Sequence, residues 1–440
     1  MKDIHMPVGF GNRIRVKNRT FIQWIVMVVA FWSVLMKPIS GLPGALTYLK
    51  YAPDGILLVM LFLLFRRQQI MLRRDLLPLL LIVVGFFIYC LLGNILQYQS
   101  AAYFLWGFRN NFRFYIAFFA FITYLDEDDV STWFRVMEIL FWVNAALSVI
   151  QFVLLGIGGD FLGGIFGIVG ASNGYTLVFL SIVVGKALLE AFDGSRPFWG
   201  CMIKCMVSIA VAAMAELKFY FVVVVLLMIG ATVLTRFSVR KLIFLLLGAG
   251  ALMTGAVLLA EWFGSHNFLS LNKIWEFATK ESYASEGDIN RLSAVSSLSE
   301  QILTKPVQKL FGLGLGNCDT SAFAVCNTPF YRKNSYLHYT WFTSAMIFLE
   351  TGYCGLSIYS GFFVTNFGQS YKRFVSRNGN QLYNRLAILT AVLCLILLVY
   401  DSSTRTEPGY MMYFVLATPF ICSKAVEKHS SQTSDTGGEM

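Results

Sequence analysis

Residues 336–355 of this chain read YLHYTWFTSAMIFLETGYCG, and they open the longest of many apolar runs. Runs of about 20 residues recur along the whole sequence, a length that crosses roughly 30 Å of hydrocarbon. They are too long for the strands of a transmembrane barrel. Because a backbone in lipid must satisfy its own hydrogen bonds, these runs predict membrane-spanning helices.

The composition supports this interpretation. Of the 440 residues, 57% are hydrophobic and only 14% are charged, unlike an ordinary soluble domain. The formal net charge is +10, but the basic residues lie in short clusters between apolar runs. Such clusters are typical of membrane topology signals, so we expect the lipid bilayer and not nucleic acid as a partner.

We therefore predict an all-α polytopic membrane protein with about twelve transmembrane helices. The expected spans are 20–37, 44–65, 76–93, 109–125, 133–155, 172–190, 197–214, 218–235, 241–260, 337–366, 384–400 and 408–423. The basic clusters fall on alternate connections, which predicts that these connections and both termini are cytoplasmic. The clusters are Arg13, Arg15, Lys17 and Arg19; Arg66, Arg67, Arg73 and Arg74; Arg236, Arg240 and Lys241; and Lys372, Arg373 and Arg377.

This topology divides the chain into four parts. We predict an N-terminal bundle of helices 1–9 at residues 1–260 and a large extracytoplasmic loop at 261–336. Helices 10–12 follow at 337–423, and a cytoplasmic tail at 424–440. A long outer segment with helix-like polar stretches is typical of a region that binds or processes something.

Charged side chains gather at the predicted outer ends of the helices. Since exposure to lipid is costly, such residues are expected to line a wet cavity. They come from five connections and are Arg109, Arg113, Glu216, Lys218, Arg291, His338, Asp401 and Arg405. Arg109 and Arg113 are four residues apart, so on a helix they share a face that could clamp an anion. The alternatives are snorkelling to lipid headgroups for the arginines and a local ion pair with Glu216 for Lys218.

His338 lies where the tenth span emerges at the outer face, and a histidine at such a position, judged alone, is more often a hydrogen-bonded helix-end residue than a catalyst. Glu350 lies further along, about 18 Å away on a helix, too deep to act beside it. We expect Glu350 to be buried, with Gly352 and Gly355 allowing a neighbouring helix to approach closely.

Two further motifs lie in the outer loop. Cys318 and Cys326 are close together on the predicted oxidising side, which predicts a disulfide. The glycine-rich LFGLGLGN at 310–317 lacks the spacing of a phosphate-binding loop. Since motifs for metal hydrolases and serine hydrolases are also missing from the sequence, we expect neither a metal nor a cofactor.

An ordered set of motifs resembles the O-antigen polymerase and O-antigen ligase superfamily of bacterial envelope glycosyltransferases. An arginine in a polar stretch is followed by a proline, a glycine string, a His-Tyr pair opening a span, and LETGYCG. The matching residues are Arg291, Pro306, Gly312, Gly314, Gly316, His338, Tyr339, Glu350, Thr351, Gly352 and Gly355. These motifs cover about 291–356, and the predicted topology extends the resemblance to the whole chain.

The resemblance implies a metal-independent, inverting membrane glycosyltransferase whose donor is an undecaprenyl-diphosphate-linked glycan. It also implies a bacterial inner-membrane protein with a periplasmic active face. Arg291 and His338 match positions associated with activity, and Asp401 is a further candidate base. The residues expected to bind diphosphate or substrate are Arg109, Arg113, Lys218, Tyr339 and Arg405. The pair Leu217–Lys218 stands where many relatives carry Ser-Arg.

Three functions fit these features. The first is a polymerase that joins lipid-linked repeat units of an O-antigen, capsule or exopolysaccharide, with chain-length regulator and flippase proteins as further partners. The second is a ligase that transfers finished glycan to lipid A-core. The third, of another class, is a flippase-like transporter of lipid-linked sugars, although the large one-sided loop and the lack of visible repeats disfavour it.

Overall fold

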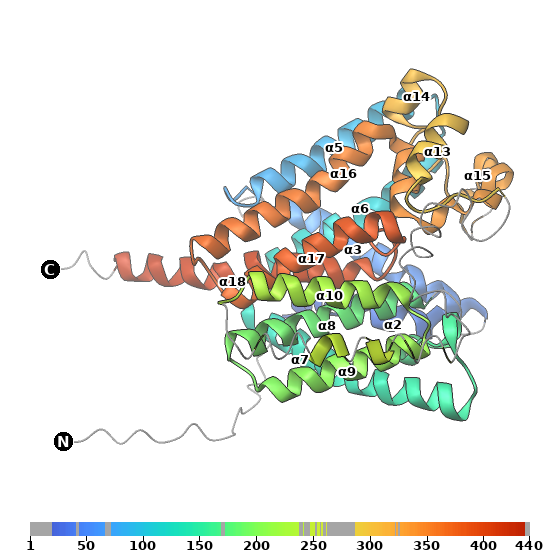
Figure 1. Cartoon of the computed structure of the whole chain (residues 1–440). Helices are drawn as coiled ribbons and strands as arrows, with labels where there is room; N and C mark the ends of the chain where they lie inside the picture. The colour runs from blue at the N-terminus through green and yellow to red at the C-terminus, as the bar shows by residue number, and fades with distance from the viewer. Residues whose placement is uncertain are drawn as a thin grey trace, which may run out of the picture.

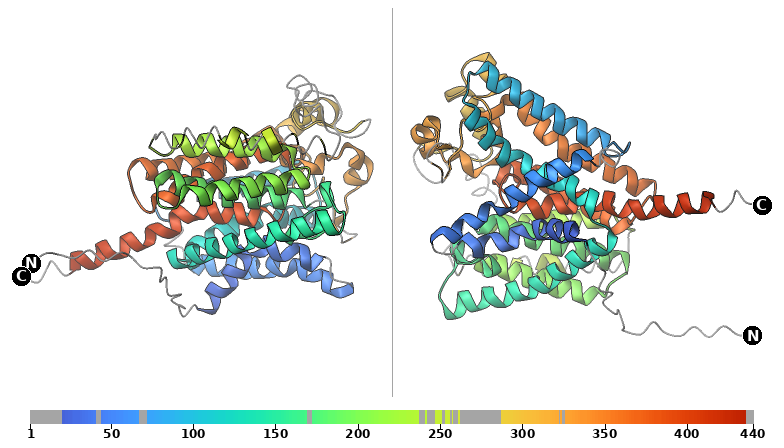
Figure 2. Two further views of the ribbon diagram at one scale, coloured as in Figure 1. Left: turned by 60° about the horizontal axis from the view of Figure 1, so that its bottom comes forward. Right: turned by 180° about the vertical axis from the view of Figure 1, so that it is seen from behind.

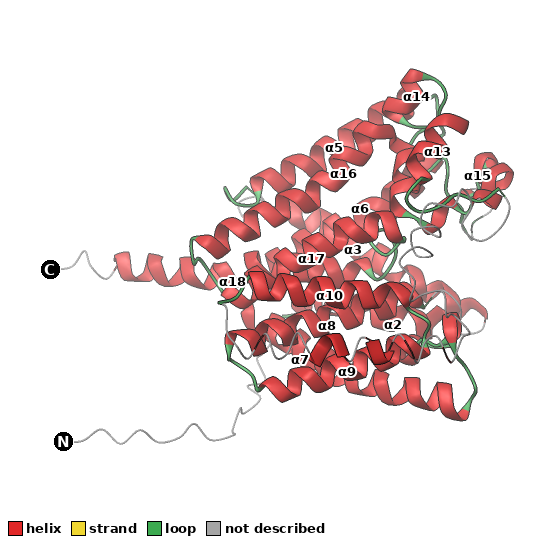
Figure 3. Cartoon of the chain, viewed as in Figure 1, coloured by secondary structure: helices red, strands yellow, loops and turns green. Residues whose placement is uncertain are grey.

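The computed structural model describes residues 20–40, 44–66, 72–168, 172–236, 287–321, 323 and 326–435, with scattered positions between 241 and 261. Within these ranges every regular element is a helix (Figure 3). The predicted all-α fold is confirmed for this part of the chain.

The described helices form a bundle (Figure 1). The N-terminal elements are α1 (Phe21–Ala30), α2 (Trp32–Ser40), η1 (Gly44–Tyr51), α3 (Ala52–Arg66), α5 (Leu77–Leu96), α6 (Ala101–Tyr124) and α7 (Glu127–Val149). The middle elements are α8 (Asn173–Asp193), α9 (Phe198–Met214) and α10 (Lys218–Val233). The C-terminal elements are α13 (Ala294–Gln301), α14 (Pro306–Phe311), α15 (Pro329–Asn334), α16 (Thr343–Val375), α17 (Gln381–Tyr400) and α18 (Gly409–Asp435).

Six described helices are long and apolar enough to cross a membrane. They are Tyr48–Arg66, Leu77–Leu96, Glu127–Leu154, Asn173–Asp193, Thr343–Val375 and Gln381–Tyr400. Shorter apolar helices at Phe21–Ala30, Phe198–Met214, Lys218–Val233 and Gly409–Ser423 lie at four more predicted spans. The predicted span at 241–260 falls largely outside the described residues. A multi-pass helical membrane protein is therefore supported, and the number twelve stays a prediction.

The connections alternate between two ends of the bundle. At one end, which we call the tail end, Arg373 of α16 pairs with Asp75, just before α5. Arg385 of α17 pairs there with Asp193, the last residue of α8, at 2.9 Å. The distal part of α18 projects from this end (Figure 2). The predicted cytoplasmic connections before α5, after α8 and after α16 thus lie together at this end.

The other end carries α13, α14 and α15, which lie beyond the ends of the long helices (Figure 1). We call the described residues of 287–336 the cap. The predicted loop 261–336 is therefore helical in its second part, while residues 262–286 lie outside the description. An apolar cluster joins the cap to the first turns of α16 and includes Ile289, Leu298, Leu337 and Met346.

α16 is interrupted at Gly352, whose φ is 68° and ψ is −169°. The carbonyls of Leu349 and Glu350 accept hydrogen bonds from the N–H groups of Leu313 (2.8 Å) and Gly314 (3.1 Å). A Cβ added to Gly352 would lie 2.1 Å from the Leu310 carbonyl oxygen. The last turn of α14 therefore approaches Gly352 closely, as the sequence predicted for a neighbouring helix. The backbone of the glycine string 312–316 follows α14 and pairs with the carbonyls beside the break.

The predicted Cys318–Cys326 disulfide is wrong for this structure, because both thiols are free. The Cys318 side chain is fully buried in the apolar cluster that joins the cap to α16, whereas Cys326 is half-buried. Burial raises the pKa of the Cys318 thiol well above its ordinary value, which disfavours the thiolate that disulfide exchange requires.

Candidate functional site

Three segments meet at the cap end of the bundle. They are 288–291 before α13, 338–342 before α16, and 400–401 at the end of α17. The Ile289 N–H donates to the Leu337 carbonyl (3.3 Å), which holds the first two segments side by side. Thr343 donates its N–H (2.9 Å) and hydroxyl (3.0 Å) to the Asp401 carbonyl, which joins α16 to the third segment.

Arg291 links the segments through its guanidinium. The guanidinium carbon lies 4.1 Å from the ring centre of Tyr400 and 6.0 Å from that of Phe342. A cation over an aromatic face is attracted by the ring quadrupole, so these rings hold the arginine in place. Its positive charge also acts on Asp401.

Asp401 directly follows α17 and is half-buried. Its carboxylate accepts the Ser403 N–H at 2.8 Å and the Ser403 hydroxyl at 2.7 Å. Burial raises the pKa of Asp401 to about 6, even though the hydrogen bonds from Ser403 and the charge of Arg291 favour the ionised form. A carboxyl group with this pKa is well placed to take up a proton near neutral pH.

His338 lies outside α16, which begins at Thr343 and not at 337. Its φ of 52° is left-handed, and it separates two short turns, Ser335–Leu337 and Tyr339–Trp341. The imidazole stacks on Trp341 at 4.1 Å, and its Nδ1 lies 3.8 Å from Oδ2 of the fully buried Asp288. This distance is too long for a hydrogen bond. The imidazole ring nevertheless lies beside a carboxylate that could orient it.

Lys218 opens α10 and forms an ion pair with Glu216 at 2.9 Å. The local-pair alternative is therefore confirmed for Lys218. The next residue, Phe219, stacks on Tyr400 with ring centres 3.6 Å apart, so the start of α10 adjoins the segment that holds Arg291. We define Asp288, Arg291, His338 and Asp401 as the rim cluster.

The other predicted cations are deeper and already paired. Arg109 binds Asp54 at 2.8 Å, and Arg113 binds Glu407 at 3.2 Å. They point to different carboxylates and do not form the predicted clamp. Burial alone would raise the pKa of Glu407, but the charges of Arg113 and Arg109 and the hydrogen bond from Tyr175 act together against it and hold the pKa below its ordinary value.

Arg405 forms a buried ion pair with Asp319. Asn110 donates its amide to the same Asp319 oxygen at 2.6 Å, so α6, the cap and the α17–α18 connection join at this point. Glu350 is 1% exposed, as predicted, and neither of its carboxyl oxygens has a hydrogen-bond partner among the described residues. The charges of Arg405 and Asp319 both act on it.

Tyr339 is fully buried, and its hydroxyl donates to the Cys318 carbonyl at 2.7 Å. In this structure it packs the cap against the bundle and presents no surface to a substrate.

Sequence reasoning selected the cations but missed most of their acidic partners, namely Asp54, Asp288, Asp319 and Glu407. Asp288, Asp319 and Glu407 lie on connections at the same predicted side of the membrane as the cations, whereas Asp54 lies inside the predicted span 44–65. Counting acids as well as bases in those connections would have indicated that Arg113 and Arg405 are neutralised. The rim cluster is the part where cationic, acidic and imidazole groups remain together near the surface.

A search with models of known protein families finds no match to this chain, and a search of curated proteins also finds none. Within the described residues, no three His, Cys, Asp or Glu side chains lie together as a metal site would require. The side chains of the rim cluster are suited to proton transfer by His338 or Asp401 and to anion stabilisation by Arg291.

Proposed function

We propose that this protein is a polysaccharide polymerase that joins undecaprenyl-diphosphate-linked repeat units at the outer face of a bacterial inner membrane. The observation that supports it best is the rim cluster, because Arg291, His338 and Asp401 come from segments far apart in sequence. The family resemblance singles out the first two, and residue chemistry alone suggested the third. The reaction proposed is metal-independent.

In the proposed reaction an acceptor sugar hydroxyl attacks the anomeric carbon of the donor. A new C–O glycosidic bond forms, and the bond from that carbon to the diphosphate oxygen breaks. The hydroxyl proton passes to His338 or Asp401, and undecaprenyl diphosphate leaves with its negative charge. Arg291 stabilises that charge, the role a metal ion has in other transferases. A single displacement inverts the anomeric centre.

The test uses a strain that lacks this protein, complemented with single variants. We expect Arg291→Ala and His338→Ala each to lower turnover about a hundredfold or more, on the order of 3 kcal/mol of transition-state stabilisation. Arg291→Lys keeps the charge but loses the fork that grips two phosphate oxygens, so it should also be impaired. Glycan gels read the product, and immunoblots confirm equal membrane abundance.

Arg332→Ala is the matched control, since Arg332 is exposed on α15 and its side chain makes no hydrogen bond or ion pair with a described residue. It should leave the glycan unchanged. Normal glycan from the His338→Ala and Arg291→Ala proteins would reject the site. The gel also separates the alternatives: single repeat units indicate a lost polymerase, and long chains retained on the carrier lipid indicate a lost ligase.

A further inference from the structure

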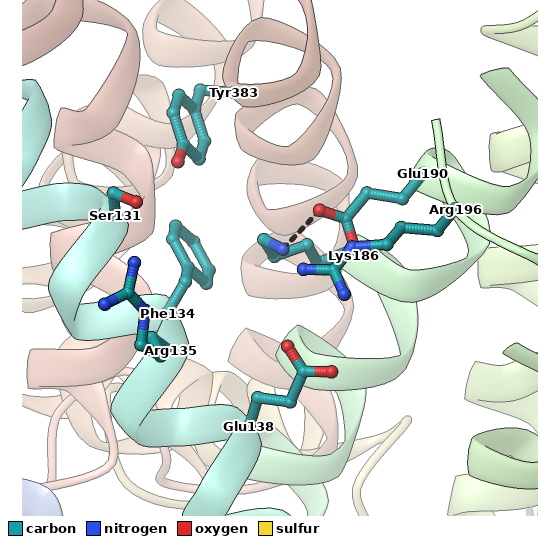
Figure 4. Close-up of a pocket in the computed structure, with 8 residues that line it drawn as sticks. All are labelled: Ser131, Phe134, Arg135, Glu138, Lys186, Glu190, Arg196 and Tyr383. Atoms are coloured by element: carbon teal, nitrogen blue, oxygen red, sulfur yellow. Dashed lines mark hydrogen bonds and ion pairs between the residues drawn. The ribbon is translucent and has the colours of Figure 1, made fainter. Parts of the chain in front are cut away.

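A second charged site lies at the tail end of the bundle, away from the rim cluster. It is a cavity of about 430 Å³ between α7, α8, the α8–α9 connection and the start of α17. Its polar lining comprises Ser131, Arg135, Glu138, Lys186, Glu190 and Arg196, which surround a common space in Figure 4. None of these residues takes part in the proposed transfer reaction.

The charges around this cavity do not balance. Lys186 binds Glu190 at 2.5 Å, and Lys204, in an adjoining pocket, binds Glu138. The side chains of Arg135 and Arg196 are exposed at the cavity and make no hydrogen bond or close ion pair with a described residue. Four cations against two carboxylates therefore leave two positive charges, both on guanidinium groups.

Ring contacts connect the walls of the cavity. Phe134 stacks on Tyr383 with ring centres 5.5 Å apart, and the Lys186 ammonium lies 5.5 Å from the Phe134 ring centre. The cavity lies at helix ends, and Trp199, just after Arg196, is 68% exposed. Exposed tryptophans at helix ends are typical of the headgroup level of a bilayer.

We propose that this cavity binds a phosphoryl group between Arg135 and Arg196, carried by a phospholipid headgroup or by free phosphate. Guanidinium forks match pairs of phosphate oxygens, and two of them suit a group that offers several oxygens and negative charge. The two carboxylates nearby are already neutralised by lysines, so they do not repel such a ligand.

The test uses the full chain in detergent, with binding followed by native mass spectrometry and thermal unfolding. Phosphatidylglycerol, inorganic phosphate and diacylglycerol with the same acyl chains are added separately. Stabilisation by phosphatidylglycerol alone assigns a lipid headgroup, and equal stabilisation by inorganic phosphate assigns a free phosphoryl group. If diacylglycerol binds as well as phosphatidylglycerol, or if none of the three binds, the proposal is wrong.

The double variant Arg135→Gln/Arg196→Gln should bind the effective probe about tenfold more weakly or worse, because both charge-assisted contacts are lost. Arg74→Gln/Lys372→Gln removes the same charge from exposed positions at the tail end outside the cavity, and should bind normally.

Ser131→Trp keeps every charge and fills the cavity, so it should also weaken binding of the probe. It tests the proposed site even if the double arginine variant does not fold. Normal binding by the cavity variants, or an equal loss in the Arg74 and Lys372 control, would overturn the proposal.

Discussion

Burial raises the pKa of Asp401, in the rim cluster, from 3.8 to about 6, so its charge changes at a pH close to neutral. If it accepts the proton, kcat/KM should fall as the pH drops below about 6, where the carboxylate is protonated. Asp401→Asn should be inactive across the range from about pH 5 to 8. An active variant with the wild-type pH profile would leave His338 as the base.

Stability should respond in the opposite sense at this residue. A carboxyl group whose pKa is raised in the folded state stabilises the fold most below its unfolded pKa, and that contribution is lost as the pH rises through about 6. Above this pH, Asp401→Asn should therefore be at least as stable as the wild type by thermal unfolding. A large loss of stability would mean that the inactive variant is simply misfolded.

Arg405 provides a second test for a single residue. The side chains of Arg405 and Asp319 are 8% and 7% exposed, so Arg405→Met leaves a buried carboxylate without its cation. We expect a loss of about 3–5 kcal/mol in the free energy of unfolding. Arg405→Met/Asp319→Asn should recover most of it, whereas Arg332→Met on the exposed surface should change little. Equal melting temperatures for Arg405→Met and Arg332→Met would contradict the buried pair.

The sequence predicted which cations lie at the outer ends of the helices but not which acids neutralise them. Arg405 and Asp319 are 86 residues apart, and their pairing depends on how the cap packs on the bundle. Lys218 and Glu216 were predictable as a pair, because a short turn forces them together. Local pairs follow from spacing, and distant pairs require the fold.

Among the elements, the interrupted helix α16 gives the sharpest prediction. Gly352→Ala adds a Cβ 2.1 Å from the Leu310 carbonyl oxygen at a φ of 68°, so it should cost about 2 kcal/mol or more. Gly361 lies in the same helix with nothing within 4 Å of an added Cβ. Gly361→Ala should be neutral or stabilising by about 0.5–1 kcal/mol. Thermal unfolding in detergent measures both, and similar melting temperatures for the two variants would reject the tight fit at Gly352.

The helices were predictable because long apolar runs specify a helix in lipid whatever their neighbours are. The break in α16 was not, since a glycine that kinks a helix looks in sequence like one that packs against another helix. The difference lies in Leu313 and Gly314, whose N–H groups reach the carbonyls of Leu349 and Glu350. The left-handed turn at His338, because of which α16 begins only at Thr343, was also not predictable, since it depends on the fold and not on the local sequence.

At the scale of the whole molecule, the two ends of the bundle should face opposite sides of the membrane. Thr304 is exposed between α13 and α14, and Ser376 is exposed just after α16. With the topology that the basic clusters predict, a membrane-impermeant maleimide should label Thr304→Cys in spheroplasts. Ser376→Cys should be labelled only after the membrane is permeabilised. The reverse pattern, or labelling of both in intact spheroplasts, would contradict this orientation.

The hydrogen bonds between the glycine string and α16 also limit where this chain can be joined to a related one in a chimera. Residues 306–316 and 343–375 complete each other's backbone hydrogen bonds, although they are separated along the chain. A chimera that exchanges only one of these segments risks leaving carbonyl groups of a membrane helix without donors, which lipid does not tolerate. Crossover points before residue 306 or after residue 375 keep both segments from one parent, so they are the junctions at which domain swaps should yield folded protein.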